Sequence, residues 1–266
     1  MQSWGVSSRF GIRETLTEPS KSGVIGLLCA ALGWDRAADT HVIAGQTRTL
    51  TDLTGLRFGV RVVREGTVRR DYHTAQNVLR AKAKLRPGKP TAEGDLQQTV
   101  LSERYYLSDA YFLVGLEGED EALLRALDEA LANPYWPLCL GRKAFAPTFP
   151  VRYANLEASE AVGNSGVVEG PLTEALLMAQ DPAWVSLVSK HRVRSQREDD
   201  PPLMPTTRYV VDSDVVIPQT LTNPQLTATR RAQRTDVPLS FEPRRFAPRE
   251  VIIYTVSDYV SIEATS

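Results

Sequence analysis

The amino-acid sequence predicts an α+β fold, and three observations lead to this prediction. Two segments have the apolar spacing of helices that pack on a core, and several others have the alternation or β-branched composition of strands. A further segment is rich in charge, broken by proline and glycine, and without an apolar face, which predicts a projecting arm. The 266 residues are enough to bury the core of one large domain or two small ones.

The first predicted helix is PSKSGVIGLLCAALGW. Pro19 and Ser20 begin it, its apolar residues face a core, and Gly33 ends it. Glycine normally weakens a helix, yet Gly23 and Gly26 both lie in the first turns. We therefore expect some group to approach the helix backbone closely there.

The second predicted helix spans about Asp120–Ala132. Its leucines share one stripe, and the Asn133-Pro134 pair ends it. Acidic residues lie beside this stripe, and they face either water or a basic partner. The sequence does not distinguish between these two interpretations of the acidic residues.

The strands and the arm follow from shorter patterns. LRFGVRVVREG alternates and predicts a strand that reaches Arg64, with TVRRDYHT as its hairpin partner. The arm is AQNVLRAKAKLRPGKPTAEGD, and the chain returns through LSERYY and the strand DAYFLVGL. WPLCLGRKAF predicts a short strand and a basic turn. One more strand in front of this order would complete the βαββαβ unit of ferredoxin-like (RRM-like) folds.

Two regions are predicted. Residues 1–149 form the ferredoxin-like palm, with a β-hairpin thumb inserted at about 75–104, and residues 34–55 are polar and turn-like. Residues 150–266 form a smaller β-rich region with strand candidates TRYVVDSD and REVIIYTVSDYVSI and a weak helix at LTEALLMAQ.

Charge is segregated along the chain although the net charge is −1. Residues 57–89 hold ten basic residues against two acidic ones, and residues 117–129 hold six acidic residues against one arginine. No Lys or Arg occurs between 153 and 189, and basic residues return at 190–197 and 230–249. This pattern suits a polyanion on one surface and protein neighbours elsewhere, and ordinary solvated faces are the alternative.

Several classes of function lack support in the sequence. No apolar run approaches the roughly 20 residues of a membrane helix, and no signal peptide is evident, so we expect a cytoplasmic protein. Cys29 and Cys139 have apolar neighbours and read as buried free thiols. The three histidines are scattered, so we expect no metal site and no cofactor. No Ser-His-Asp order, paired-carboxylate pattern or dinucleotide fingerprint rises above chance.

Four motifs occur in the order MQSWG, TEPSKSGVIGLLCAALG, RDYHT and GRK, with PREVIIY as a fainter match near the end. In this order they resemble family five of the CRISPR-associated proteins (RAMP superfamily), in the form found in type I-E Cascade complexes. The resemblance covers about the first 150 residues, and the helix motif is its most specific part.

The resemblance implies a palm with a thumb, and a non-catalytic RNA-binding role in antiviral defence. Such a subunit holds the 5′ handle of the guide crRNA and caps the backbone filament. It contacts the backbone subunits and the large subunit, close to target DNA at the start of the heteroduplex. Another subunit cuts the guide precursor. In the family a strand precedes MQSWG, so we expect the true start to lie upstream and the first palm strand to be missing here.

The residues and the resemblance together give a set of candidate RNA-binding residues. A phosphate at the start of the first helix would meet Lys21 and Gly23, and simple N-capping is the alternative. A base could stack on Trp4, which is otherwise a core or interface residue. The full set is Gln2, Trp4, Arg9, Lys21, Ser22, Gly23, His73, Arg80, Lys82, Lys84, Arg86, Lys89, Arg104, Arg142 and Lys143.

Two further functions remain open. Tyr72 and His73 could act in a metal-independent endoribonuclease that processes precursor crRNA, with His73 as general base. The stretch between 153 and 189 without basic residues is compatible with a subunit that bridges proteins and does not contact RNA.

Overall fold

The computed structural model describes residues 1–5, 8–9, 11–79, 96–153, 165–179, 206–215 and 226–257. The elements in chain order are β1 (Ser8–Arg9), β2 (Ile12–Arg13), α1 (Lys21–Leu32), β3 (Thr40–Ile43), β4 (Gln46–Thr49), α2 (Leu50–Thr54), β5 (Arg57–Arg64), β6 (Thr67–Leu79), β7 (Leu96–Ser108), β8 (Tyr111–Glu117), α3 (Glu121–Ala132), α4 (Leu172–Met178), β9 (Thr206–Asp212), β10 (Leu226–Phe241) and β11 (Arg244–Ser257).

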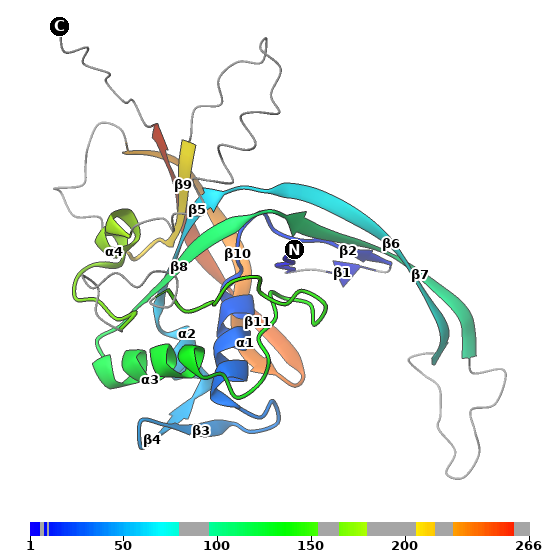
Figure 1. Ribbon diagram of the computed structural model, residues 1–266, viewed down its shortest axis with the longest axis horizontal. Coiled ribbons are helices and arrows are strands. Elements are labelled where there is room, and N and C mark those ends of the chain that lie inside the picture. Colours follow the sequence, from blue (N-terminus) through cyan, green and yellow to red (C-terminus); the bar gives the residue numbers. More distant parts are fainter. Residues whose placement is uncertain are drawn as a thin grey trace, which may run out of the picture.

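The main sheet of the described residues has the order β10-β11-β9-β5-β8, and all its pairs are antiparallel. Strand β5 lies between β8 and β9, so strands from before and after residue 150 share one sheet (Figure 1). The α+β class is confirmed. The division at residue 150 and the ferredoxin-like order of the palm stay predictions.

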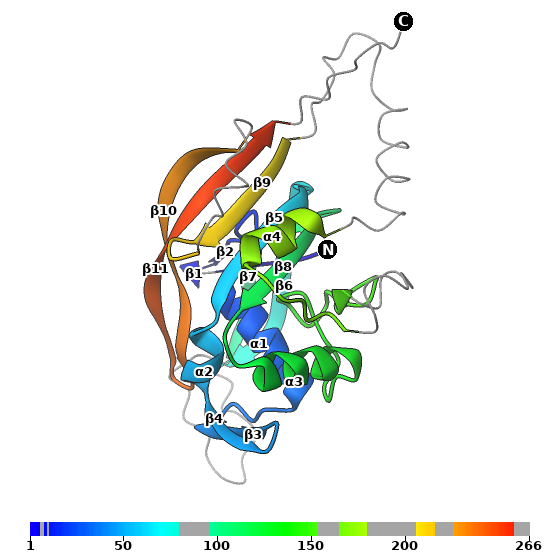
Figure 2. The same cartoon turned by 90° about the vertical axis from the view of Figure 1, so that its left-hand side faces the viewer.

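The two faces of β5 carry different residues because side chains alternate along a strand. Phe58 and Val60 are fully buried on the face that meets α1 and α3. On the other face Gly59 pairs with Gly115, and α4 packs over this pair (Figure 2). A Cβ atom at Gly115 would lie 2.3 Å from Cδ1 of Leu172, so any larger residue would push α4 away from the sheet.

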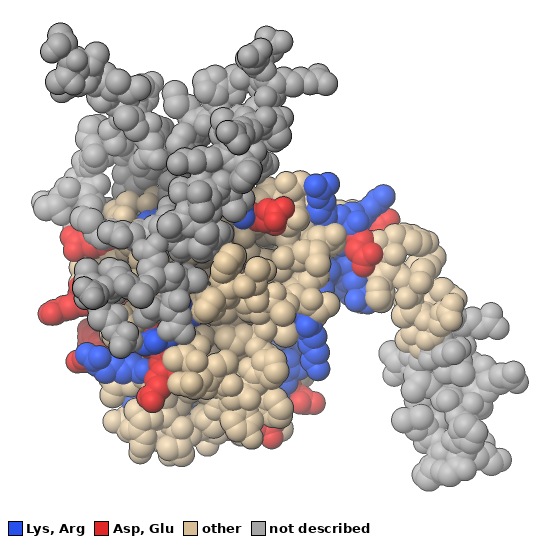
Figure 3. Space-filling model, in the orientation of Figure 1, with Lys and Arg blue, Asp and Glu red and all other residues tan. Residues whose placement is uncertain are grey.

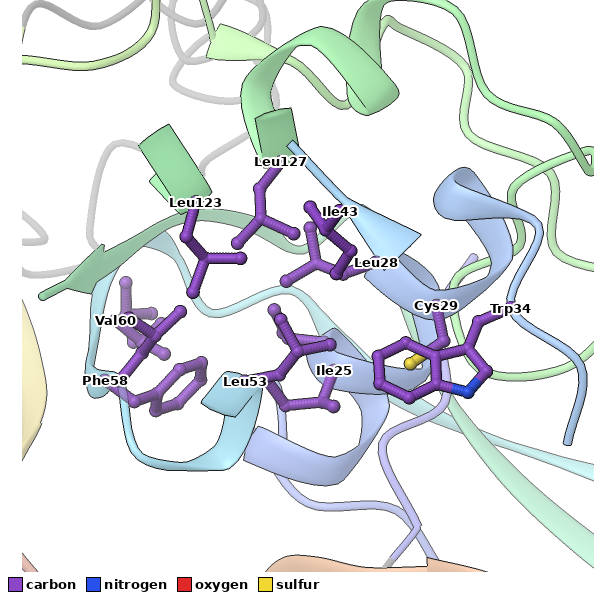
Figure 4. Packing of buried hydrophobic residues seen from close by; sticks show 13 residues of the cluster. Ile25, Leu28, Cys29, Trp34, Ile43, Leu53, Phe58, Val60, Leu123 and Leu127 are labelled. Carbon is purple, nitrogen blue, oxygen red and sulfur yellow. The ribbon is translucent and has the colours of Figure 1, made fainter. Parts of the chain in front are cut away.

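Helix α1 forms as predicted. The Ser20 side chain accepts a hydrogen bond from the Gly23 N–H, and Gly33 ends the helix in the left-handed region with φ 71°. Figure 4 shows Ile25 and Leu28 of α1 among the labelled core residues, together with leucines of α3 and Phe58 of β5. Helix α3 also matches its prediction, with Asp120 as N-cap.

Strands β6 and β7 form a long antiparallel ribbon, which arches away from the main sheet (Figure 1). Their register runs from Thr67 opposite Ser108 to Leu79 opposite Leu96, and β2 joins the base of β7 in parallel. The predicted pairing of TVRRDYHT with β5 is wrong, because β8 and β9 already occupy the two edges of β5.

Two other local predictions are wrong. WPLCLGRKAF forms no strand. The Leu140 carbonyl accepts from the Ser3 N–H, the Leu140 N–H donates to the Phe145 carbonyl within the same segment, and Gly141 turns the chain with φ 90°. The polar residues 34–55 hold β3, β4 and α2 where only turns were predicted. Strand β9 and helix α4 match their predictions, and β11 begins five residues before its predicted start, with residues 258–262 of that prediction outside the described residues. None of the helices within the described ranges combines the length and apolar character needed to cross a membrane.

Candidate nucleic-acid interface

The start of α1, predicted to bind phosphate, contacts carboxylates of the protein itself. The backbone N–H of Lys21 donates to Oδ2 of Asp236 at 2.7 Å, and its Nζ lies 3.2 Å from Oδ2 of Asp212. Asp236 is fully buried and also accepts two hydrogen bonds from Arg249, at 2.7 and 3.0 Å. Because a carboxylate already meets the positive end of the helix, Lys21 is not placed to receive a phosphate.

The neighbours of Lys21 are also occupied by the fold. The Gly23 N–H donates to Oγ of Ser20 at 3.2 Å, and Oγ of Ser22 lies 3.4 Å from the same atom. The close approach predicted at Gly23 exists, but the approaching group is Trp4, whose Cε3 would lie 2.8 Å from an added Cβ. At Gly26 the prediction is wrong, because an added Cβ would meet nothing within 4 Å apart from the adjoining backbone of the helix itself.

The opening motif lies in the interior. Nε2 of Gln2 donates to the Ala110 carbonyl at 2.8 Å, and Nε1 of Trp4 donates to Oε1 of Gln2 at 3.0 Å. Trp4 is only 4% exposed and packs in a small cluster with Leu107. The base-stacking prediction conflicts with this packing, and Trp4 fits its alternative as a core residue. The Arg9 side chain lies outside the described residues.

A second group of predicted residues meets on one face of the β6–β7 ribbon. Residues directly opposite each other share a face, and so do residues two apart in one strand. This face, with the adjoining turn Gly141–Lys143, is here called the basic face. Its members are Arg13, Arg69, Asp71, His73, Ser102, Arg104, Tyr106, Arg142 and Lys143.

The Gly141–Lys143 turn is fastened to the ribbon by Arg142. Its guanidinium donates to the Tyr105 carbonyl at 3.0 Å and the Arg13 carbonyl at 3.3 Å. It also lies 5.7 Å from the ring centre of Phe145, and that ring contacts Tyr106. Burial and the nearby charges of Arg104 and Arg13 lower the pKa of Arg142, although Asp71 acts in the opposite direction. These positive charges are therefore close enough to repel one another.

Among the members of the basic face, Asp71 is the one carboxylate, and it lies opposite Arg104. Within the part of the chain that the structure describes, no carboxylate forms an ion pair with Arg104, Arg142 or Lys143. Arg104 donates to the Ser102 hydroxyl at 3.2 Å, and Asp71 lies 3.9 Å from Nδ1 of His73. Figure 3 shows Lys and Arg side chains gathered where the ribbon leaves the body. A group of cations without carboxylate partners is suited to bind a polyanion.

The acidic segment of α3 differs from the basic face, because arginines of the same chain neutralise much of its charge. Asp128 forms an ion pair with Arg152 at 2.7 Å, and Asp120 pairs with Arg48. Burial alone would raise the pKa of Asp128, but Arg152 outweighs it and the net shift is downward. Pairing within the chain thus explains part of an acidic run that the sequence left open between water and a partner.

The two residues of the nuclease alternative point to opposite sides of β6. Tyr72 is 63% exposed and lies opposite Glu103, whereas His73 lies opposite Ser102. Adjacent residues of a strand face opposite ways, so these two side chains cannot act together on one phosphodiester. No described group of His, Cys, Asp and Glu is arranged to hold a metal ion.

The predicted thumb residues Arg80, Lys82, Lys84, Arg86 and Lys89 lie outside the described residues. Conversely, Arg13 and Arg69 belong to the basic face but were not among the candidates. The signal for Arg69 was its spacing, two residues before Asp71 and four before His73 on one face of β6. Arg13 had no comparable signal, because its place depends on the pairing of β2 with β7.

Of the two cysteines, Cys29 is buried as predicted, and burial raises the pKa of its thiol to about 12. Cys139 is a free thiol, as predicted, but it is only partly buried, so the predicted burial is wrong for this residue. Its Sγ lies 3.4 Å from the Lys143 carbonyl oxygen, close to the surface turn.

Comparison with known proteins identifies the family. A family model described as "CRISPR-associated protein (Cas_Cas5)" matches residues 1–252. The chain belongs to this family. The resemblance predicted from its motifs is confirmed, and it extends well beyond the first 150 residues.

Similar proteins support the assignment. The CRISPR system Cascade subunit CasD of Escherichia coli (strain K12) is 32% identical over 170 residues, which cover 60% of this chain and 69% of the relative. A chain of a "CRISPR RNA-guided surveillance complex" matches with a TM-score of 0.61 at 27% identity, over 96% of this chain and 86% of that one. A structure titled "Crystal structure of Cas protein" matches with a TM-score of 0.55 at 31% identity, over 96% and 90%.

Proposed function

We propose that this family member is a non-catalytic subunit of a Cascade complex, in which it binds the 5′ handle of the guide crRNA and caps the backbone filament. The observation that carries the proposal is the basic face, where Arg104, Arg142 and Lys143 are gathered and form no ion pair with a carboxylate of the described residues. Membership of a family with a Cascade subunit among its relatives supports the same role.

The geometry of the basic face fits phosphate better than bases. Arg142 is held by two carbonyls and an aromatic ring, so its charge is fixed in place before any ligand arrives. Arginine and lysine side chains on one face of a ribbon can follow a sugar–phosphate chain, and released counterions drive the binding. The thumb cations from Arg80 to Lys89 would extend this contact beyond the described part of the ribbon.

The other partners also belong to the proposal. We infer contacts with backbone subunits, with the large subunit and with target DNA near the start of the heteroduplex, as the family resemblance implies. A relative named as a Cascade subunit and a similar chain of a surveillance complex support membership of such an assembly. Exposed apolar side chains on the opposite face of the ribbon, at Ile12, Tyr72 and Leu101, offer surface for a protein neighbour.

A charge reversal tests the RNA-binding role. We expect the Arg104→Glu, Lys143→Glu double variant to lose guide RNA from the assembled complex at moderate salt, because two contacts become repulsive. The matched control reverses two exposed arginines of the body, Arg36 and Arg125, and should retain the RNA. Retention by the basic-face variant equal to that of the control would overturn the proposal.

A second experiment addresses catalysis. The purified chain is incubated with repeat RNA in EDTA, and the RNA should remain intact. Clean cleavage that disappears in His73→Ala would establish the endoribonuclease and remove the non-catalytic assignment.

A further inference from the structure

A groove lies on the body of the protein where α3 meets the C-terminal end of α1 and the turn between β3 and β4. Figures 1 and 2 both show α3 beside the lower part of α1, with the β3–β4 hairpin below them. The groove has a volume of about 550 Å³. Its lining includes Ala31 of α1, Ala44 of the turn, and Ala122, Ala126 and Ala130 of α3, so it is here called the alanine groove.

Two exposed aromatic residues lie beside the alanine groove. Tyr135 is part of the lining and is 70% exposed, and the adjacent Trp136 is 54% exposed. Their ring centres are 5.1 Å apart in an edge-to-face arrangement. The Tyr135 N–H donates to the Ala31 carbonyl at 2.8 Å, and the Trp136 N–H donates to the Ala30 carbonyl at 3.2 Å. Helix α1 thus holds this backbone in place, and exposed rings of this kind supply much of the binding energy at protein interfaces.

The charges around the groove favour a cation. Arg125 forms an ion pair with Glu121 at 2.5 Å, whereas Glu129 forms none within the described residues. The last turns of α1 and α3 both contribute to the lining, and neither contains a basic residue to offset the negative end of its helix dipole. Aromatic ring faces also attract cations. An RNA strand is disfavoured here, because the one cation of the described lining is already paired.

A second copy of this chain does not supply a matching basic helix from its described residues. The basic residues of the described helices are Lys21 and Arg125. Lys21 is buried, and Arg125 is paired with Glu121. The complementary surface therefore belongs to a different protein.

We propose that the alanine groove binds a helix of another protein subunit of the complex, which carries an arginine or lysine for Glu129 and the aromatic pair. The inference rests on the proposed function, because it needs an assembly with other proteins, but no residue of the basic face lines the groove. Ala122, Ala126 and Ala130 are four residues apart on one side of α3. Their short side chains allow the small or apolar face of a second helix to approach closely.

A photoreactive residue in the assembled complex tests this proposal. Tyr135 is replaced by p-benzoylphenylalanine, which keeps a ring over Gly33, and the crosslinked peptides are mapped. We expect one peptide of another subunit, with an arginine or lysine within about one helical turn of the crosslinked position. Crosslinks to the guide RNA, to a second copy of this chain, or to nothing would overturn the proposal. The same replacement at Trp136 provides a second position, should the first variant fail to fold.

A charge reversal tests the cation preference. Glu129→Lys should lower the crosslink yield by about fivefold or more, the size expected when one partly exposed ion pair is lost. The matched control, Glu119→Lys, changes an exposed carboxylate outside the groove and should keep the wild-type yield. Equal yields in the two variants would overturn the proposed partner.

Guide-RNA content separates this proposal from the proposed function. The Glu129→Lys variant should retain the RNA, because the basic face is unchanged. If the expected crosslinks are absent while the RNA is retained, the groove proposal is wrong and the proposed function stands. A wild-type chain that enters no complex and binds no guide RNA would remove both.

Discussion

The start of α1 and the base of the β6–β7 ribbon both carry basic residues in family motifs, yet their surroundings differ. Lys21 is 5% exposed and is held by Asp212 and Asp236. Lys143 is exposed, and Arg104 bonds only to a hydroxyl among the described residues. The first set of charges therefore stabilises the fold, and the second remains available to a ligand. Whether a basic residue stabilises the fold or can bind a ligand therefore depends on the carboxylates around it, and not on the residue type alone.

The largest expected effect concerns the buried carboxylate. Asp236→Asn should lower the free energy of unfolding by about 3–5 kcal/mol, because the buried cations of Lys21 and Arg249 would then share a single carboxylate, that of Asp212. Urea denaturation measures this. The contrasting variant at the ribbon, Glu103→Gln, removes an exposed pair with Arg70 and should cost under about 1 kcal/mol. Equal losses would remove the distinction between the two regions.

The glycines of α1 provide a pair of substitutions with opposite signs. Gly23→Ala should destabilise the protein by about 1–3 kcal/mol through overpacking against Trp4, less the gain in helix propensity. Gly26→Ala meets open space and should stabilise it by up to about 1 kcal/mol. Thermal unfolding gives both values, and stabilisation by Gly23→Ala would contradict the packing of Trp4 at the helix start.

The environment of Glu18 predicts that the free energy of unfolding falls at acid pH. Burial would raise its pKa, but the hydrogen bond from Thr17 and the charges of Arg208 and Arg234 outweigh this, and the folded pKa is lowered. The carboxylate thus stabilises the fold above about pH 4.3, and this stabilisation is lost as the pH falls through the lower folded value. Glu18→Gln should flatten the acid side of the stability curve.

The control for Glu18 is Glu119→Gln, at an exposed carboxylate without an ion pair in the described residues. It should leave the shape of the curve unchanged. A Glu18→Gln curve that still falls as steeply as wild type below pH 5 would show that other carboxylates carry the acid dependence.

The smallest expected effect is a difference in the salt dependence of RNA binding between variants of Lys143 and Lys21. Lys143→Met should reduce the slope of log affinity for handle RNA against log salt by about 0.7, the value of one phosphate contact. Lys21→Met should leave that slope unchanged at a temperature where the variant is folded. A reduced slope for Lys21→Met would mean that the start of α1 reaches the RNA after all.

Local patterns in the sequence predicted much of the fold. Helices α1 and α3 were predicted with both of their ends, because end signals and the 3.6-residue period act within a few neighbours. Strand pairing was predicted less well. The partner of β6 proved to be β7, since the assignment depends on which strands fill the edges of β5 from far along the chain.

The site depends even more strongly on residues that are far apart in the sequence. Lys21 meets Asp212 and Asp236, which are 191 and 215 residues away in sequence. Nothing near Lys21 indicates these partners, so its motif was read as free for phosphate. The sequence did offer a signal for the proximity of Arg104 and Arg142. Arg104 ends the predicted thumb, and Arg142 lies in the basic turn predicted after a palm strand.

Crosslinking tests the central distinction most directly. The complex is assembled on guide RNA that carries photoreactive nucleotides in the 5′ handle, and the crosslinked peptides of this chain are mapped. We predict crosslinks to β6, β7 and the Gly141–Lys143 turn, and none to the first turn of α1. Crosslinks at Lys21–Gly23 with none on the ribbon would contradict the account.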